Sequence, residues 1–307
     1  MRVLITGVCG FIGERLALRL AGLGHDVIGT GRQTVCPFSG LHSYHSVDVL
    51  DSNALNALGA DVDAIVHLAA LTAHSEIVDN RYHALQINLE GTRNALQAFH
   101  TSHRARRFVY SSTGKVYGAF TSLPITEEEP PRPLNILGKS KLIAERLVDF
   151  YAMGDERQYT ALRIFNVYGP GQKMNFLVPT ILSQLFPKGS GYKVRLGDIR
   201  AARDYLYIDD VIEAFVRVLT AQTLVPGYQV CNVASGIPVS AADIVKQISA
   251  IMGHEIEVEA DSSRVRADEL DEEYGSFARI EELFGWRPAE TLESGLARTI
   301  KEFACRL

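Results

Sequence analysis

A glycine-rich stretch near the N-terminus restricts the fold of this chain more than any other feature. A short run rich in β-branched residues, Val3–Thr6, is followed at once by GVCGFIG and then by a helical pattern that reaches Ala21. Glycine is needed where a chain turns tightly, where backbone approaches a pyrophosphate and where a helix packs closely on a strand. The pattern predicts a strand–turn–helix unit whose helix N-terminus binds a dinucleotide phosphate, with a purely structural turn as the alternative. The cofactor contacts expected here are Gly7, Gly10, Phe11, Ile12 and Gly13.

Short apolar runs alternate with helical patterns through the first half of the chain. Strands are expected at residues 3–6, 27–30, 64–67, 108–111 and 160–165, and helices at residues 11–21, 53–58, 83–100 and 138–151. Short β-branched or aromatic runs that end at small residues suit buried parallel strands. Their alternation with helices predicts an α/β fold with a doubly wound parallel sheet of the Rossmann type.

The second half of the chain predicts a smaller α/β substrate-binding lobe. Asp209–Val233 has the pattern of a helix and a strand that return to the sheet. We therefore expect the dinucleotide-binding domain to comprise residues 1–165 with about 205–235, and the lobe to comprise about 166–204 with 236–307. Asp209 and Asp210 are expected to cap the returning helix rather than to bind a metal, and no metal site is predicted.

Composition excludes several classes of partner. The 307 residues carry a formal net charge of −5, which gives no electrostatic reason to expect nucleic acid or an anionic membrane surface. No apolar run approaches the roughly 20 residues that span a bilayer. The four cysteines lie far apart and form no CxxC pair, so neither a zinc site nor a disulfide framework is indicated. With no secretory leader recognised, a reducing, cytoplasmic location is expected.

The end of the second expected strand bears on the choice between NAD and NADP. An acidic residue there would bind the adenosine ribose hydroxyls and repel a 2′-phosphate. This chain has Gly29-Thr30-Gly31-Arg32 instead. Arg32 could donate charge-assisted hydrogen bonds to a 2′-phosphate, which favours NADP modestly. An exposed arginine beside NAD held by other contacts is the alternative.

Further motifs follow the glycine-rich turn along nearly the whole chain. They are TGVCGFIG, SVDV, DAIVHLAA, NLEGT, SSTGKVYG, GKSK, RIFNVYGPG, ARDYLYIDDV and FGWRP. In this order they resemble the extended short-chain dehydrogenase/reductases, and specifically the NAD-dependent epimerase/dehydratase family that acts on nucleotide sugars. The resemblance implies NAD or NADP as cofactor and a nucleotide sugar as substrate. It also implies a homodimer packed through the helices that follow Asn88 and Leu137.

The resemblance implies a role for each matched position. Thr113 would bind the sugar hydroxyl that reacts, and Lys141 would hold the nicotinamide ribose. The expected cofactor contacts further along the chain are Asp48, Val49, Leu68, Ala69, Ala70, Asn88 and Lys141. The substrate's diphosphate or nucleotide would be held by Asn166, Arg203 and Arg266, with Arg264 as a competitor for the last role. The planar fork of an arginine such as Arg203 matches a phosphate independently of any resemblance, although an ion pair with Asp204 is the alternative.

One position departs from the family pattern. The helix that carries Lys141 would begin with a tyrosine that transfers the proton, and Leu137 occupies that place. A positioned general base contributes roughly 10² to 10⁴ in rate, and leucine cannot supply it. Lys115 follows Thr113 by two positions and is one replacement, with a phosphate contact or a solvated charge as the alternative. Lys141 is a second replacement.

Tyr117 and His74 are weaker candidates for the missing proton-transfer group, because each also suits a structural or solvent-facing role. The residues Gly114 and Lys115 stand where related dehydratases pair an acid with a base, so a standard 4,6-dehydration is not expected. Two functions remain open: an enzyme with a displaced proton-transfer group, and a silent protein that binds the dinucleotide or the nucleotide sugar or dimerises with an active partner. A leucine introduced artificially at position 137 is a third reading.

Overall fold

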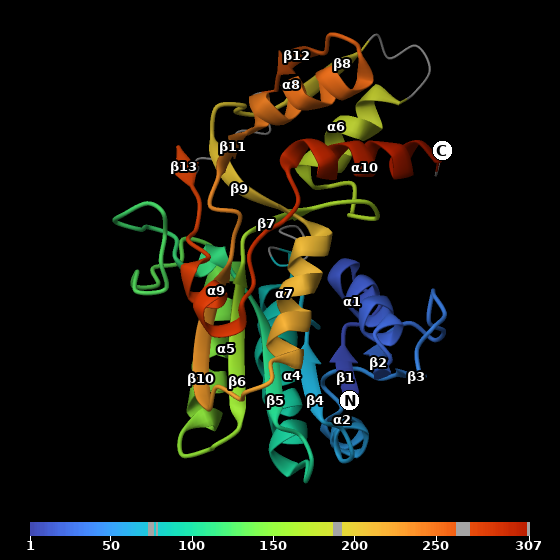
Figure 1. Ribbon diagram of the computed structural model, residues 1–307, viewed down its shortest axis with the longest axis vertical. Coiled ribbons are helices and arrows are strands. Elements are labelled where there is room, and N and C mark those ends of the chain that lie inside the picture. The colour runs from blue at the N-terminus through green and yellow to red at the C-terminus, as the bar shows by residue number, and fades with distance from the viewer. Residues whose placement is uncertain (73–76, 78, 187–191, 262–270, 306–307) are drawn as a thin grey trace.

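The protein is described by a computed structural model that covers residues 1–72, 77, 79–186, 192–261 and 271–305. Figure 1 shows a parallel sheet in the lower half and a second group of elements beyond the carboxyl ends of its strands. Within the described residues, no helix is both long and apolar enough to cross a membrane. All four cysteines are free.

The central sheet has seven strands in the order β10-β6-β5-β4-β1-β2-β3, and every neighbouring pair is parallel. This confirms the α/β, doubly wound architecture predicted from the alternating patterns. The strands are β1 (Arg2–Thr6), β2 (Asp26–Gly31), β3 (Ser43–Ser46), β4 (Ala64–His67), β5 (Arg107–Thr113), β6 (Gln158–Ile164) and β10 (Gly227–Val233). Because β10 returns to the edge beside β6, residues far apart in sequence complete one sheet.

Each strand supplies both faces of the sheet, because successive side chains point to opposite sides. In β1, Val3 and Ile5 join the core on the side of α1 and α7, whereas Leu4 joins the core on the side of α2, α4 and α5. All three side chains are fully buried. The flanking helices are α1 (Phe11–Gly22), α2 (Ser52–Gly59), α4 (Arg81–Thr101), α5 (Ile136–Ala152) and α7 (Ile208–Thr220).

The second group of elements holds two small sheets and most of the remaining helices. In one sheet β11, β9 and β13 lie side by side and β7 pairs with β9, and in the other β12 pairs with β8. The bounds are β7 (Asn166–Tyr168), α6 (Leu177–Leu185), β8 (Lys193–Leu196), β9 (Ala202–Tyr207), β11 (Pro238–Ser240), α8 (Ala241–Met252), β12 (Glu257–Ala260), β13 (Glu272–Glu273) and α10 (Leu292–Cys305). Helix α9 (Ala278–Phe284) lies beside β10 of the central sheet (Figure 1). The exact domain boundaries stay a prediction.

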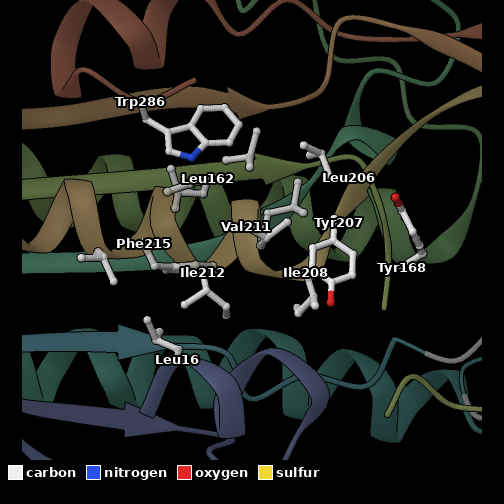
Figure 2. Packing of buried hydrophobic residues seen from close by; sticks show 14 of the residues in the cluster. Leu16, Leu162, Tyr168, Leu206, Tyr207, Ile208, Val211, Ile212, Phe215 and Trp286 are labelled. Carbon is white, nitrogen blue, oxygen red and sulfur yellow. The ribbon is translucent and has the colours of Figure 1, made fainter. Parts of the chain in front are cut away.

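Helix α7 joins the two groups through one continuous core. Figure 2 shows Trp286 among apolar side chains of β6 and α7, including Leu162, Val211 and Phe215. Trp286 is 1% exposed, and its indole N–H donates to the carbonyl oxygen of Asp210 at 3.0 Å. The core therefore fixes α7, and with it β9, which leads into α7.

The expectation that Asp209 and Asp210 cap α7 is wrong. The N-cap is Tyr207, without a side-chain cap bond, and both acids lie inside the first turn. The Asp210 carboxylate instead accepts hydrogen bonds from the backbone N–H groups of Ala289 and Glu290, at 3.0 and 3.1 Å. Their negative charge still suits the positive end of the helix, but their bonds are made to α10 and the segment before it.

Candidate active site

The strand order places a binding crevice at the carboxyl end of β1. The chain proceeds from β1 to β2 and β3 on one side, and from β4 to β5 and β6 on the other. In doubly wound sheets, ligands bind where the order reverses in this way. The glycine-rich turn after β1, the loop after β4 and the end of β5 all meet this edge (Figure 1).

The turn between β1 and α1 has room for backbone only. Gly7 has a φ of +72°, and a Cβ on it would lie 2.8 Å from the Cα atom of Ala69. A Cβ on Gly13 would lie 2.7 Å from the carbonyl oxygen of Val8. Gly10 is the N-cap of α1 and has no side chain to bond the first helical N–H groups. Those N–H groups, at Phe11 and after, suit a phosphate.

The segment after β4 forms the opposite wall of this turn. The N–H of Leu68 donates to the carbonyl oxygen of Thr6 at 3.2 Å, and that of Ala69 donates to the Thr6 hydroxyl at 3.4 Å. Leu68, Ala69 and Ala70 are all partly exposed. Their small or apolar side chains beside Gly7 are consistent with a surface that a flat cofactor could cover.

The buried Asn88 side chain holds the segment after β4 in place through hydrogen bonds. Its Oδ1 accepts from the N–H of Leu71 at 2.8 Å, and its Nδ2 donates to the Leu71 carbonyl and to the Ser140 hydroxyl, both at 3.1 Å. Asn88 is 1% exposed, so its amide is fully used. The structure therefore places Asn88 as a tie between the loop after β4 and α5. A direct cofactor contact by its side chain stays a prediction that this geometry does not favour.

Asp48 and Val49, two of the expected cofactor contacts, lie in a tight turn before α2. Asp48 is exposed and accepts from the N–H of Leu50 at 2.9 Å. Val49 is 7% exposed, and its carbonyl oxygen accepts from Asn94 of α4 at 2.9 Å. A Cβ on Gly91 would lie 2.7 Å from Val49, so α4 packs tightly against this turn and fixes its position.

The end of β2 has little room for an acidic side chain. A Cβ on Gly31 would lie 3.0 Å from the amide oxygen of Gln33 and 3.2 Å from both the Cys9 sulfur and the Tyr44 hydroxyl. Arg32 is exposed and directly follows the strand. A side chain at position 31 would therefore displace these three neighbours slightly.

Lys141 is a buried amine at the centre of the site. Its Nζ donates to the carbonyl oxygen of Ser111 at 2.6 Å and lies 4.8 Å from the centre of the Tyr110 ring. The residue is 4% exposed. Burial lowers the pKa of Lys141 to about 8, although the charge of Glu145 opposes the shift. An amine with this pKa can gain or lose a proton near neutral pH.

A buried ion pair, absent from the sequence-based expectations, supports the strand and the helix that meet here. Arg163 of β6 binds Glu145 of α5 through Nη2 and Oε2 at 2.7 Å, and the Ser112 hydroxyl donates to the same carboxylate. Both charged residues are under 5% exposed. The Arg163 guanidinium also lies 4.7 Å from the centre of the Tyr117 ring. The pair therefore links β5, α5 and β6 directly below the site.

Tyr117 belongs to the core rather than to the reaction. It is fully buried, and its hydroxyl donates to the amide oxygen of Asn232 at 2.6 Å. Burial raises the pKa of Tyr117 to about 12. The structural role that the sequence left open for Tyr117 is therefore the one that the geometry supports.

Thr113 and Leu137 stand at the end of β5 and at the start of α5. Thr113 ends β5, and its hydroxyl oxygen accepts from the N–H of Lys115 at 3.3 Å, which leaves its own hydrogen available for donation. Leu137 lies in the first turn of α5, whose N-cap Asn135 accepts from the N–H of Gly138 at 2.9 Å. Leu137 is partly exposed and offers no group that titrates.

Lys115 is one half of an ion pair. It lies in the short 3-10 helix η1 (Gly114–Val116), and its Nζ is 2.7 Å from Oε2 of Glu273 in β13. Nε of Arg203 lies 3.8 Å from the same carboxylate oxygen. Glu273 was not expected from the sequence, and only the pairing of β13 with β9 reveals it. The acid beside Arg203 is thus Glu273, whereas Asp204 accepts from three backbone N–H groups.

Asn166 joins β7 to β9 near these charges. Its Nδ2 donates to the carbonyl oxygen of Asp204 at 3.0 Å, which leaves its amide oxygen on the partly exposed side.

His74, Arg264 and Arg266 lie outside the described residues, so their expected roles stay predictions. Within the described residues, no group of three or more metal-ligating side chains is found.

Comparison with known proteins agrees with this architecture. Residues 3–234 match the model of the NAD dependent epimerase/dehydratase family. GDP-6-deoxy-D-mannose reductase of Pseudomonas aeruginosa is 32% identical over 100% of this chain and 98% of its own length. UDP-glucose 4-epimerase of Mycolicibacterium smegmatis is 30% identical over 99% of this chain and 98% of its own length. The solved structure of RMD from Pseudomonas aeruginosa complexed with NADPH has a TM-score of 0.85 and 30% identity, covering 100% of this chain and 99% of that one.

Proposed function

Because the chain belongs to the NAD-dependent epimerase/dehydratase family, we propose that it is an NAD(P)-dependent enzyme that transfers hydride at the ring of a nucleotide-activated sugar. Two relatives at 30% identity or more, a reductase of a GDP-sugar and an epimerase of a UDP-sugar, support this general reaction. Thr113 would donate to the reacting sugar oxygen. The backbone at Gly10–Gly13 would hold the cofactor pyrophosphate, and Arg203 would hold the substrate's phosphate.

The observation that carries the proposal is the buried amine of Lys141. A lysine that is 4% exposed costs stability unless its charge is compensated. The Ser111 carbonyl oxygen, the Tyr110 ring and the charge of Glu145 compensate it only in part, because burial still lowers the pKa of Lys141. In a molecule that only folds, an apolar side chain would serve better at this place. With a pKa of about 8, Lys141 is poised to exchange protons, and it lies on the helix face of Leu137, one turn away. We assign to Lys141 the proton transfer that a tyrosine at position 137 would perform.

Lys115 supports the reaction in a different way. Its Nζ is paired with the Glu273 carboxylate, so we assign to it an electrostatic contact rather than the proton transfer. The phosphate-contact alternative for Lys115 is therefore the one that we adopt. The cofactor supplies and receives hydride when bound; the residues described here orient the sugar, hold its phosphates and move the proton.

NADP is the cofactor that the end of β2 favours. Gly31 provides no acid that would repel a 2′-phosphate, and Arg32 is exposed next to it. The Pseudomonas structure is a complex with NADPH, whereas the similar MoeE5 structure holds UDP-glucuronic acid and NAD, so the choice of NADP rests on the end of β2. A net reductase uses NADPH as a consumed reductant, whereas an epimerase returns its hydride. NADP binding would thus favour reduction of a keto sugar over epimerisation.

A second function has one specific observation in its favour. Leu137 provides no proton-transfer group, so a silent protein that binds the dinucleotide or the nucleotide sugar is the alternative. The deciding experiment is a turnover screen in deuterated water, with NAD or NADP and a panel of UDP-, dTDP-, GDP- and CDP-sugars, including 4-keto sugars with NADPH. Mass spectrometry would report deuterium uptake, water loss or reduction. A product supports the enzyme, whereas binding without any product supports the silent alternative.

We also propose that two copies of the chain associate through α4 and α5. These neighbouring helices expose large apolar side chains on their outer surface: Tyr82 and Leu85 on α4, and Ile143 and Phe150 on α5. Phe150 is 68% exposed, and it follows Ile143 by seven residues, so the two share one helix face. Burial of such a face against its own copy would remove it from water.

A further inference from the structure

Two cations of the proposed substrate site converge on one carboxylate oxygen. Oε2 of Glu273 lies 2.7 Å from Nζ of Lys115 and 3.8 Å from Nε of Arg203. The three groups come from η1, β9 and β13, which are distant in sequence and meet only in the folded chain. An oxygen held between an ammonium and a guanidinium has the surroundings that a phosphate oxygen requires. The carboxylate therefore stands where an anionic ligand group would bind.

Glu273 is held in this position by backbone bonds that do not involve its side chain. The N–H of Ile125 donates to the carbonyl oxygen of Tyr274 at 2.9 Å, and the N–H of Ser276 donates back to Ile125 at 2.8 Å. The N–H of Gly275 donates to the Asp204 carboxylate at 3.3 Å. The segment would keep its place without the ion pair, so fixing β13 does not account for the charged side chain.

Close packing ties this segment to the end of β5 as well. The Phe165 ring lies between two glycines: a Cβ on Gly114 would approach it to 3.2 Å, and a Cβ on Gly275 to 2.5 Å. Gly114 is the neighbour of both Thr113 and Lys115. The distance between Glu273 and the reacting end of the site is therefore set by a rigid contact.

The side chains of Lys115, Arg203 and Glu273 differ in exposure, and the difference would allow a phosphate to replace Glu273 as the partner of Lys115. The side chain of Glu273 is 9% exposed and that of Arg203 12%, whereas that of Lys115 is 33% exposed. Lys115 can thus be approached from solvent while its partner stays enclosed. Arg203 also donates to the carbonyl oxygen of Ala202 at 2.7 Å, so it does not depend on Glu273 for its position.

From this arrangement we infer that Glu273 is an internal competitor of the substrate's diphosphate: its carboxylate neutralises Lys115 and Arg203 and so limits the affinity of the site for the anion. This inference rests on the proposed function. Its consequence is that product leaves more readily than it would if the Glu273 carboxylate were absent. The sign of the effect separates it from a structural role, because removing a merely structural side chain would weaken binding.

The test is to titrate UDP and GDP into the full-length protein by calorimetry, with Glu273→Gln as the variant. Glu272→Gln is the matched control, because Glu272 is the neighbouring acid of β13 and is exposed. We expect Glu273→Gln to bind the better of the two nucleotides about fivefold or more tightly, with a steeper dependence on salt. The control should match the wild type. In Lys115→Ala/Glu273→Gln most of the gain should be lost, since one of the two released cations is absent.

Each outcome decides between the proposals. If the wild type binds a nucleotide and Glu273→Gln binds it equally or more weakly, the competitor role is wrong and the proposed function is untouched. If neither protein binds UDP or GDP, the titration is repeated with dTDP and CDP, and if neither binds any of the four nucleotides, both proposals fail. Binding by Glu273→Gln alone supports the competitor role. If circular dichroism shows that Glu273→Gln does not fold, Glu273→Asp, which withdraws the carboxylate by one methylene, should raise the affinity by a smaller factor; no increase would contradict the inference.

Discussion

The amine of Lys141 donates a 2.6 Å hydrogen bond to the carbonyl oxygen of Ser111, two residues before Thr113. This bond joins α5 to β5 at the point where the strand reaches the site. It also explains why the amine is buried, since the carbonyl lies inside the sheet. A desolvated lysine at this place has consequences both for stability and for proton transfer.

The stability of the protein should depend on pH through Lys141. Its pKa is lowered from 10.5 to about 8 in the folded chain. Between these values the unfolded chain binds more protons, so stability rises with pH; below about 8 the folded chain bears the full cost of the buried charge. The shift corresponds to roughly 3 kcal/mol. Urea unfolding of the wild type and of Lys141→Met at several pH values measures this contribution to the free energy of unfolding.

The difference between the two proteins carries this prediction, because other groups titrate equally in both. Lys141→Met should be more stable than the wild type near pH 8, and its advantage should shrink as the pH rises towards 10.5. An advantage that does not change with pH would show that the amine is not desolvated in solution.

A tyrosine at position 137 should raise turnover. Leu137 and Lys141 are four residues apart on α5 and share a helix face, so a phenol would stand beside the amine. A positioned acid/base group contributes roughly 10² to 10⁴ in rate. Because Lys141 already transfers the proton in the proposed reaction, Leu137→Tyr should gain less than this full factor with the substrate that the screen identifies, and Leu137→Phe is the control that adds the ring without the hydroxyl. Equal rates for the two variants would argue that the site no longer uses a group at this place.

The buried pair of Arg163 and Glu145 should be essential for folding. Removal of one partner leaves an uncompensated charge, which costs roughly 3–5 kcal/mol. Arg163→Met should lower the free energy of unfolding by about that amount. Arg146→Met is the matched control on the surface, where the partner Asp149 is 3.9 Å away and both side chains are largely exposed; it should change stability by less than about 1 kcal/mol. Similar losses of stability in both variants would mean that the buried pair contributes no more to the free energy of unfolding than an exposed pair does.

Local patterns predicted every strand of the central sheet except β3, Ser43–Ser46, which has no apolar run. The strand expected at residues 27–30 is Asp26–Gly31, and the helix expected at 138–151 is Ile136–Ala152. These elements bury one or both faces, so the period of their apolar residues reports their structure directly. The glycine-rich turn was predictable for a similar reason, because backbone approach excludes every side chain at Gly7 and Gly13.

Long-range pairings could not be read from the sequence. Lys115 and Glu273 are separated by 158 positions, and β13 has only two residues, which is too short for any periodic signal. Asn88 was expected to contact the cofactor, yet its amide is used by Leu71 and Ser140, because the loop after β4 needs that support. The position of Glu273 beside Lys115 and the hydrogen-bond partners of Asn88 depend on how distant segments meet in the fold. No local sequence pattern specifies such meetings.

Arg32 should determine the choice of cofactor. A charge-assisted hydrogen bond to a 2′-phosphate is worth about 1.5–3 kcal/mol, which is roughly tenfold or more in affinity. Arg32→Ala should therefore weaken NADPH by about that factor and leave NADH nearly unchanged, as measured by fluorescence titration. Equal losses for the two cofactors would show that Arg32 does not contact the 2′-phosphate.

A charge on the outer face of α5 should separate the proposed dimer. Phe150 is 68% exposed in the single chain, and a glutamate there would be buried against the other copy without a partner. Phe150→Glu should sediment as a monomer at concentrations at which the wild type sediments as a dimer. The control is Phe176→Glu, which places the same charge on the 43% exposed Phe176, directly before α6 and far from α5 in the fold (Figure 1). If both variants sediment like the wild type, the interface does not include this face of α5; if the wild type is itself a monomer, the proposed association is wrong.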